Sequence, residues 1–210
     1  MVQYKKDEIK EKIDSAAIAV FAVEGYESTK ISEIAKKAGV SVGNVYRYYG
    51  GKEEIFYSIL PEQFLMEYQL LLREKIAGFR GHIGSGRYQQ TWLTSEPFIS
   101  FMAEHRSRIL ILFKGSRGTR YEKIKTELVS FLIGLLRENY PEMYEKNVEA
   151  AGNEFVITSV YEGLIDLFGK VLSKAETEQE LKEYLSLVNT YHLHGITEII
   201  EGSEKGGQQE

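Results

Sequence analysis

The sequence predicts an all-α protein of about nine helices. Apolar residues recur at helical spacing along most of the chain, and only 3 of its 210 residues are proline. No segment combines sustained alternation with β-branched residues and hairpin turns, so no sheet is expected. Apolar residues make up 43% of the chain, which is enough for an ordered core at this length.

The first predicted helix covers residues 5–24. Lysine and glutamate occupy one face, and Gly25-Tyr26 ends the pattern. The other face is an apolar stripe of Ile9, Ile13, Ala16, Ala17, Val20 and Phe21. We expect this stripe to support the segment that follows.

Residues 29–52 predict two short helices joined by a tight turn. Thr29 is placed to cap the first of them, and Gly39 stands where a left-handed residue ends a helix. Ser41 is placed to cap the second. The apolar face of the first helix consists of Ile31, Ile34, Ala35 and Ala38. Periodicity alone favours an ordinary helical corner with a solvated outer face, because such corners are common.

The second short helix has two different sides at 3.6 residues per turn. Val42, Val45, Tyr46 and Tyr49 fall on the side expected to pack inward. The outward side is small or polar and consists of Gly43, Asn44, Arg47 and Tyr48. Two helices joined by a glycine turn, the second with such a face, are what a DNA-binding helix-turn-helix requires.

The order of residues favours this interpretation over the ordinary corner. The matching positions are Ile34-Ala35, Ala38-Gly39-Val40, Ser41, Tyr46, Tyr48 and Lys52. In that order and spacing they resemble the signature of TetR-family transcriptional regulators. Tyr49 departs from the usual Phe, and Gly50-Gly51 replaces a more polar pair. The resemblance implies an N-terminal three-helix helix-turn-helix DNA-binding domain followed by a C-terminal helical ligand-binding and dimerisation domain.

We therefore divide the chain at the start of the fourth helix. Residues 1–52 form the predicted DNA-binding domain, 53–203 the effector-binding and dimerisation domain, and 204–210 a disordered tail. The net charge of −5 is unevenly distributed: residues 1–52 hold 9 Lys/Arg and 7 Asp/Glu, a net of +2. Because screening limits exposed charges to roughly 10 Å, the local charge decides phosphate contact.

The predicted DNA contacts come from two sources. Geometry places Gly43, Asn44 and Arg47 toward a groove, with Arg47 suited to guanine and Asn44 to adenine. The resemblance adds Val42 and Ser32 at bases. It also adds Thr29, Tyr46, Tyr48 and Lys52 at phosphates. Lys30 and Ser41 complete the predicted set.

The rest of the chain predicts further helices. One begins at Lys52 and is kinked or ended by Pro61, a candidate hinge. Others begin near Pro97 and cover residues 108–113, 119–139, 148–173 and 181–201. Residues 78–91 and 114–120 are rich in glycine and are expected to be loops. Their glycine spacing matches no phosphate-binding motif.

The resemblance implies a small-molecule site in this body. The candidate effector-pocket residues are Phe98, Phe101, His105, Phe131, Phe155, Tyr161 and Glu162. Aromatic residues at helical spacing also fit an ordinary core. Glu162 and Asp166 lie four apart on one helix face, which suits a cationic ligand or a cation across a dimer.

The last two helices are candidates for a four-helix dimer interface. The predicted interface residues are Phe155, Leu185, Val188, His192, Gly195, Ile196 and Ile199. The alternative is a core that belongs to one chain alone.

An enzyme is not expected. The chain has no cysteine and no nucleophile motif, and His192 and His194 point to nearly opposite faces of a helix, so we predict no catalytic residues, metal or cofactor. The charged N-terminus does not fit a signal peptide, and no apolar run approaches ~18 residues, so we expect a cytoplasmic protein without membrane contact.

The predicted function is a ligand-responsive repressor. Its expected partners are a double-stranded DNA operator of palindromic sequence, a second copy of the chain, and an unknown small-molecule effector that releases the DNA. The alternative is a helical architectural or interaction protein that uses the same DNA-binding head without an effector.

Overall fold

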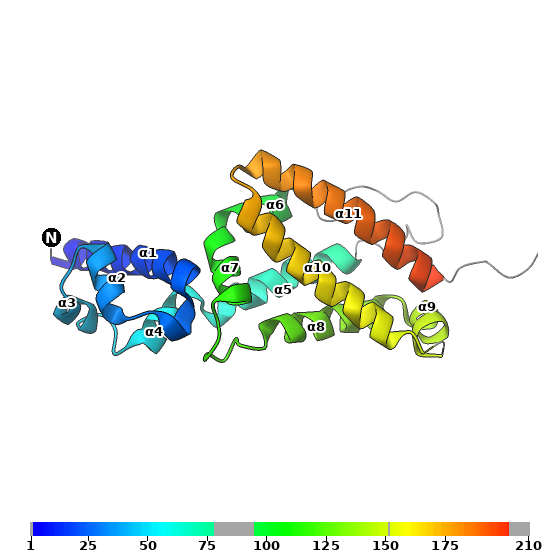
Figure 1. Cartoon of the computed structure of the whole chain (residues 1–210), viewed down its shortest axis with the longest axis horizontal. Helices are drawn as coiled ribbons and strands as arrows, with labels where there is room; N and C mark the ends of the chain where they lie inside the picture. Colours follow the sequence, from blue (N-terminus) through cyan, green and yellow to red (C-terminus); the bar gives the residue numbers. More distant parts are fainter. Residues whose placement is uncertain (1, 78–94, 151, 202–210) are drawn as a thin grey trace, which may run out of the picture. The chain divides into compact units, whose positions relative to one another are not determined.

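The computed structural model describes residues 2–77, 95–150 and 152–201 (Figure 1). Within these ranges it describes the side chains of residues 7–192, except that of residue 75. These residues form helices and connecting turns without a strand, which confirms the all-α prediction. The helices are α1 (Val2–Ser28), α2 (Ile31–Ala38), α3 (Val42–Tyr46), α4 (Lys52–Ile59), α5 (Glu62–Ala77), α6 (Glu96–Glu104), α7 (Arg106–Lys114), α8 (Ile124–Asn139), α9 (Pro141–Tyr144), the π-helical η1 (Glu145–Glu149), α10 (Glu154–Lys174) and α11 (Glu178–Glu201). None of the helices in the described part of the chain is long and apolar enough to cross a membrane.

The chain divides into two compact units. The head unit comprises residues 1–68 and 105–124, and the body unit comprises 69–104 and 125–210. These bounds differ from the predicted functional division at residues 52 and 203, which stays a prediction. The main difference is that residues 105–124 belong with the N-terminal helices.

The core of the head unit is apolar, and α1 to α4 and α7 contribute to it. The fully buried side chains of the first four helices include Ile13, Phe21, Ile34, Val45, Ile55 and Phe56. The rings of Phe21 and Phe56 meet edge to face at 5.3 Å, which links α1 to α4. The stripe predicted on the first helix therefore packs against the helix-turn-helix, as expected.

The C-terminal part of α7 and the following turn complete the head unit. The amide of Tyr26 donates to the carbonyl of Gly115 at 2.7 Å. A Cβ atom at Gly115 would lie only 3.2 Å from the carbonyl oxygens of Phe21 and Ile111, so α1 and α7 approach more closely than a larger residue permits. The Tyr121 hydroxyl donates to the carbonyl of Leu60 at 3.2 Å, which fixes the turn against the end of α4.

Several predicted helix boundaries need correction. Thr29 does not cap α2: Lys30 holds the N-cap position, and the Thr29 hydroxyl donates to the carbonyl of Gly25 at 2.6 Å. Pro61 ends α4 rather than kinking a continuous helix. The helix expected over 119–139 begins at Ile124, after a hydrogen-bonded turn. The helix expected over 148–173 is replaced by η1 and α10, with Gly152 in the left-handed region between them.

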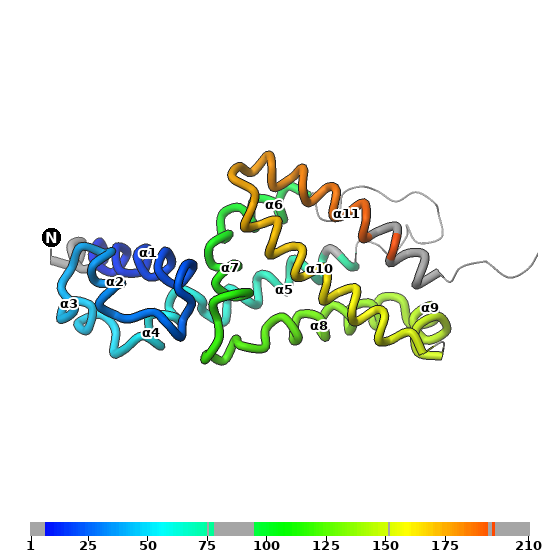
Figure 2. Tube along the Cα trace, in the orientation of Figure 1, coloured from blue at the N-terminus to red at the C-terminus, as the bar shows by residue number. Residues whose placement is uncertain are grey.

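The body unit is organised around α10 and α11, which pack side by side and run in opposite directions (Figure 2). Phe98 of α6 meets Phe168 of α10 edge to face at 6.1 Å. Two ion pairs at the surface of the unit join these two helices to others. Lys125 of α8 pairs with Asp166 of α10 at 2.6 Å, and Lys182 of α11 pairs with Glu96 of α6 at 3.2 Å. Asp166 thus has a cationic partner within its own chain.

His192 of α11 is buried against the ring of Tyr161, with the ring centroids 5.3 Å apart. Burial lowers the pKa of His192 to about 4, whereas an unfolded histidine titrates near ~6.5. Between these values the unfolded chain binds a proton that the folded chain does not. The free energy of unfolding should therefore fall by about 3 kcal/mol as the pH drops from neutral to 4.

We expect His192→Leu to remove that part of the pH dependence. Urea unfolding of both proteins at pH 7 and pH 4.5 measures it. The part of the pH dependence that is due to carboxylates remains in both proteins. The difference between their slopes of unfolding free energy against pH therefore reports His192 alone. Equal slopes would show that the imidazole is accessible to protons in the folded chain.

Candidate nucleic-acid interface

The turn between α2 and α3 is fixed by its own backbone and one hydroxyl. Gly39 ends α2 in the left-handed conformation (φ 69°, ψ 29°), and the amide of Val40 donates to the carbonyl of Ala35 at 3.0 Å. The Ser41 hydroxyl accepts from the amide of Asn44 at 3.1 Å and caps α3. Both caps were predicted from the sequence and are confirmed.

This turn presents one side of α3 to the outside. Gly43 and Arg47 are exposed, Asn44 and Tyr48 are half-buried, and Val45 is buried beneath them. A Cβ atom at Gly43 would meet nothing closer than the Ser41 hydroxyl at 4.0 Å. Neither packing nor a positive φ requires glycine at this position.

Two residues of α3 differ from the predicted inward side. Tyr46 is 55% exposed and Val42 is 41% exposed, so only Val45 and Tyr49 pack inward. The helix is only five residues long, and its apolar face is correspondingly narrow. Tyr46 is therefore free to reach a rim contact with its hydroxyl.

Tyr49, the departure from the usual phenylalanine, has a role within the chain. Its hydroxyl donates to the carboxylate of Asp14 on α1 and accepts from the Ser58 hydroxyl of α4. Burial and the Asp14 hydrogen bond raise the pKa of Tyr49. After it, the amide of Gly50 donates to the Glu54 carboxylate at 2.6 Å, which holds the Gly50-Gly51 joint.

The exposed cations among residues 7–47 fall into two groups. Lys10 and Lys12 are paired with acids of the same helix. Four others are exposed and have no polar partner among the residues that the structure describes: Lys30, Lys36, Lys37 and Arg47. Lys36 and Lys37 were missed by the sequence prediction, because basic residues in the last turn of a helix are ordinarily explained by its dipole.

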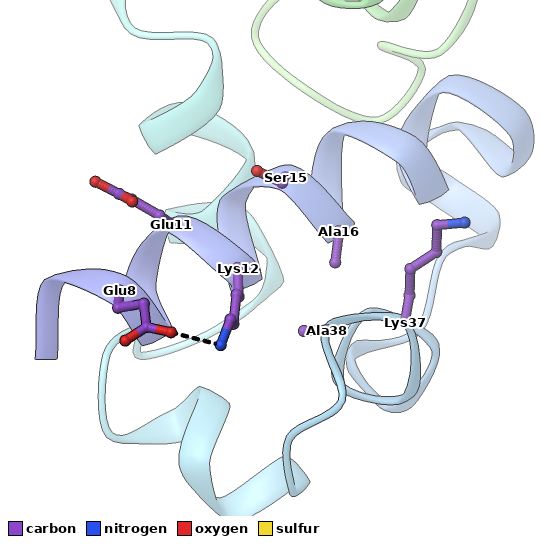
Figure 3. A pocket seen from close by; sticks show the side chains of 7 residues that line it. All are labelled: Glu8, Glu11, Lys12, Ser15, Ala16, Lys37 and Ala38. Atoms are coloured by element: carbon purple, nitrogen blue, oxygen red, sulfur yellow. Dashed lines mark hydrogen bonds and ion pairs between the residues drawn. The ribbon is translucent and has the colours of Figure 1, made fainter. Parts of the chain in front are cut away.

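Lys37 also borders a hollow of about 550 Å³ between α1 and α2 (Figure 3). The hollow is lined by Glu8, Glu11, Lys12, Ser15, Ala16, Lys37 and Ala38. Glu8 and Lys12 pair with each other there at 2.8 Å. The lining carries both signs of charge, so it does not form a focused site for an anion.

Two predicted phosphate contacts, Thr29 and Lys52, donate their side-chain hydrogen bonds to backbone carbonyls within the head unit. Thr29 is only 2% exposed, with its hydroxyl on the Gly25 carbonyl. The ammonium of Lys52 donates to the carbonyl oxygens of Tyr26, Glu27 and Thr29 at 2.7, 3.2 and 2.9 Å. Ser32 is exposed beside the start of α2.

Residues 13–59 match the family model described as "Bacterial regulatory proteins, tetR family". The head of the chain carries a TetR-family helix-turn-helix domain. The match identifies this helix-turn-helix as one that DNA-binding regulators carry. The matched residues run from α1 to the end of α4 and so contain the whole helix-turn-helix described above.

Relatives of the TetR-family head are similar over the same part. The chain is 39% identical over 67 residues to the fatty acid metabolism regulator protein of Bacillus subtilis (strain 168), covering 30% of this chain and 34% of that protein. It is 36% identical over 72 residues to the HTH-type transcriptional regulator HbdR of Aromatoleum sp. (strain CIB), covering 34% of this chain and 31% of that protein. The similarity thus spans about a third of the length of these relatives.

A solved structure, that of the TetR-family repressor AlkX from Dietzia sp. strain DQ12-45-1b, is 16% identical. It aligns over 87% of this chain and 97% of AlkX with a TM-score of 0.37. A score of this size is too low to transfer the position of any residue.

The candidate effector-pocket residues have different surroundings. Phe98 and Tyr161 are buried in the body unit, and Phe101 and Phe131 are half-buried. His105 belongs to the head unit, where its ring meets Phe64 edge to face at 5.3 Å. Phe155 and Glu162 are exposed, so a pocket enclosed by one chain would not include them.

The candidate dimer-interface residues also differ in burial. Leu185, Val188 and His192 are buried within their own chain, and Gly195 is exposed. The side chains of Ile196 and Ile199 lie outside the described residues. Phe155, which was predicted for the interface, is exposed. The other large exposed apolar side chains in the described parts of α10 and α11 are Val156, Leu187 and Tyr191, which were not predicted. A groove of about 480 Å³ between the two helices is lined by Phe155, Val156, Ser159, Val160, Gly163, Leu164, Leu167, Tyr191 and His192.

Proposed function

We propose that the chain is a DNA-binding transcriptional regulator that acts as a repressor. The observation that carries this proposal is the outward side of α3, where Gly43, Asn44 and Arg47 stand on a rigidly capped helix. A helix-turn-helix inserts the N-terminal part of such a helix into the major groove. The match of residues 13–59 to the TetR-family model supports the same conclusion.

The proposed contacts follow from exposure and chemistry. Arg47 donates two hydrogen bonds to a guanine edge, and Asn44 pairs with adenine. Gly43 admits close approach of the backbone, and Val42 offers an apolar contact to a thymine methyl group. The proposed phosphate and rim contacts are Lys30, Ser32, Lys36, Lys37, Ser41, Tyr46 and Tyr48.

The proposed binding unit is a homodimer on a palindromic operator. Two heads related by a two-fold axis read two half-sites, whose separation starts at about 34–36 Å if they are one helical turn apart. The exposed aromatic residues of α10 and α11 support this part of the proposal, because a surface of that kind is stabilised by covering it.

The proposed switch is a small molecule that favours a conformation with the heads differently spaced. The resemblance of the head to TetR-family regulators is the reason for proposing it. A ligand that changes the bound fraction from 99:1 to 1:99 must prefer one conformation by roughly 5.5 kcal/mol. Titration of the DNA complex with compounds that raise the Tm of the free protein tests this part. Constant operator affinity across all of them would leave a repressor without an effector.

The test of DNA reading starts from a random-sequence duplex pool, from which the purified protein should select a palindrome. Arg47→Ala is expected to lower affinity for the selected duplex by roughly 10- to 100-fold for each half-site, since a bidentate base contact contributes about 1–3 kcal/mol. It should also relax the preference at one base pair of each half-site. Fluorescence anisotropy at fixed salt measures the affinity.

The matched control is Arg73→Ala. Arg73 is an exposed arginine of the body unit, paired with Glu138 at 3.0 Å, so its loss should leave DNA affinity unchanged. If Arg47→Ala binds as tightly and as selectively as the unaltered protein, α3 does not read bases. Binding without any selected sequence would favour the alternative, an architectural protein that uses the same head.

A further inference from the structure

The structure gives Lys52 a complete set of partners inside the head unit. Lys52 is the first residue of α4, and its ammonium lies 2.7 Å from the carbonyl oxygen of Tyr26, 2.9 Å from that of Thr29 and 3.2 Å from that of Glu27. The same nitrogen lies 4.5 Å from the centre of the Tyr26 ring. An ammonium has three N–H donors and no acceptor, so these carbonyls use all of its hydrogen-bonding capacity.

The three carbonyls are acceptors that the helix cannot satisfy by itself. Gly25 interrupts α1 with a non-helical conformation (φ 72°, ψ 168°), and Tyr26, Glu27 and Thr29 follow it. Carbonyls at the C-terminal end of a helix lack intrahelical partners and carry the negative end of its dipole. A cation placed there satisfies the orphan acceptors and the dipole together.

Lys52 and the carbonyls that it binds lie on either side of the helix-turn-helix in the sequence. Thr29 lies just before α2, and Lys52 follows α3 and the Gly50-Gly51 joint. The hydrogen bond between them therefore joins the entrance and the exit of the helix-turn-helix. The bonds to Tyr26 and Glu27 fasten both ends to α1.

We propose that Lys52 is a positioning residue that holds the helix-turn-helix on α1, and that it is not a phosphate ligand. The proposal rests on the proposed DNA-binding function. It runs against the expectation that the resemblance gave for Lys52. To reach a phosphate, the ammonium would have to leave at least one carbonyl, whereas Lys30, Lys36, Lys37 and Arg47 are exposed and have no polar partner among the described residues.

The experiment compares Lys52→Met with Lys36→Met and the unaltered protein. Methionine keeps much of the length of the lysine stem and removes the charge and the donors. Hydrogen–deuterium exchange of the free protein follows peptides within residues 30–51. Binding to a duplex of about 30 base pairs, selected by the unaltered protein, is measured over a range of salt concentrations.

The two variants should behave in opposite ways. Lys52→Met should speed exchange within 30–51 by about tenfold or more, because hydrogen bonds to a charged group each contribute a factor of that size. It should weaken DNA binding without changing the slope of log K against log salt. Lys36→Met should leave exchange unchanged and reduce the slope by about 0.9 for each protomer, as the loss of a phosphate contact does.

A reduced salt slope for Lys52→Met, or unchanged exchange, overturns the proposal. If Lys52→Met does not fold, Lys52→Arg replaces it. Arginine keeps the charge that a phosphate contact needs but not the compact ammonium that fits three carbonyls, so faster exchange with an unchanged slope is expected. If the unaltered protein binds no DNA, the proposed function fails, and the exchange measurement alone still decides whether Lys52 holds the helix-turn-helix.

Discussion

Replacing Phe155 by aspartate is expected to convert the proposed dimer into monomers. Phe155 is 80% exposed on α10, and Tyr191 on α11 is 79% exposed, at opposite sides of the same groove. Aromatic residues at the centre of an interface commonly contribute about 2 kcal/mol or more each, and an aspartate there would be buried without a partner. Light scattering after size-exclusion chromatography measures the mass directly.

The same substitution should lower operator affinity by roughly 100-fold or more. A monomer engages one half-site at a time, and linking two binding modules raises overall affinity by about 10²–10⁴. Arg47 and the rest of the head unit are untouched by the change. The loss should therefore be large on the palindrome and small on a duplex that carries a single half-site.

Leu70→Asp is the matched control for this experiment. Leu70 of α5 is also an exposed apolar side chain of the body unit, and it does not line the groove between α10 and α11. It should leave the protein dimeric. A dimeric Phe155→Asp variant, or an unaltered protein that is monomeric at micromolar concentration, would remove the assignment of this face.

The local features of the head could be predicted from the sequence because they depend on neighbouring residues. Gly39 and Ser41 act within three or four positions of themselves, and the residues between them leave few other backbone solutions. The exposure of Arg47, the C-cap of α3, was also predicted, because it follows from the helical period of the residues just before it. Tyr46 was placed on the wrong side because a wheel assigns sides to a five-residue helix without knowing how narrow the buried strip is.

The features that were not predicted depend on contacts between residues that are far apart in the sequence. Lys52 meets carbonyls 23 to 26 positions earlier in the chain, and Gly115 meets Tyr26 across a still longer separation. No periodicity records such contacts. The apolar stripe of α11 was real, but Leu185 and Val188 in it cover the chain's own core, and a stripe does not distinguish that core from a partner's.

Gly25→Val is expected to destabilise the protein by about 2–6 kcal/mol. Gly25 adopts φ 72° and ψ 168°, a region that is essentially restricted to glycine and costs other residues about 1–3 kcal/mol. A Cβ atom there would lie 3.5 Å from the Cα atom of Gly115, so the additional methyl groups of valine would crowd the α7 backbone. Overpacking of that kind adds about 1–3 kcal/mol.

The consequence should extend from stability to DNA binding, because Gly25 directs the chain toward the carbonyls that hold Lys52. Urea unfolding measures the stability, and anisotropy measures the affinity of whatever protein remains folded. Gly134→Val makes the same change at an exposed position of α8, where a Cβ atom meets nothing within 4 Å. That control should change the free energy of unfolding by about 0.5 kcal/mol or less. Equal losses at the two glycines would show that the backbone at Gly25 is not restricted and that the close approach of α1 and α7 does not depend on it.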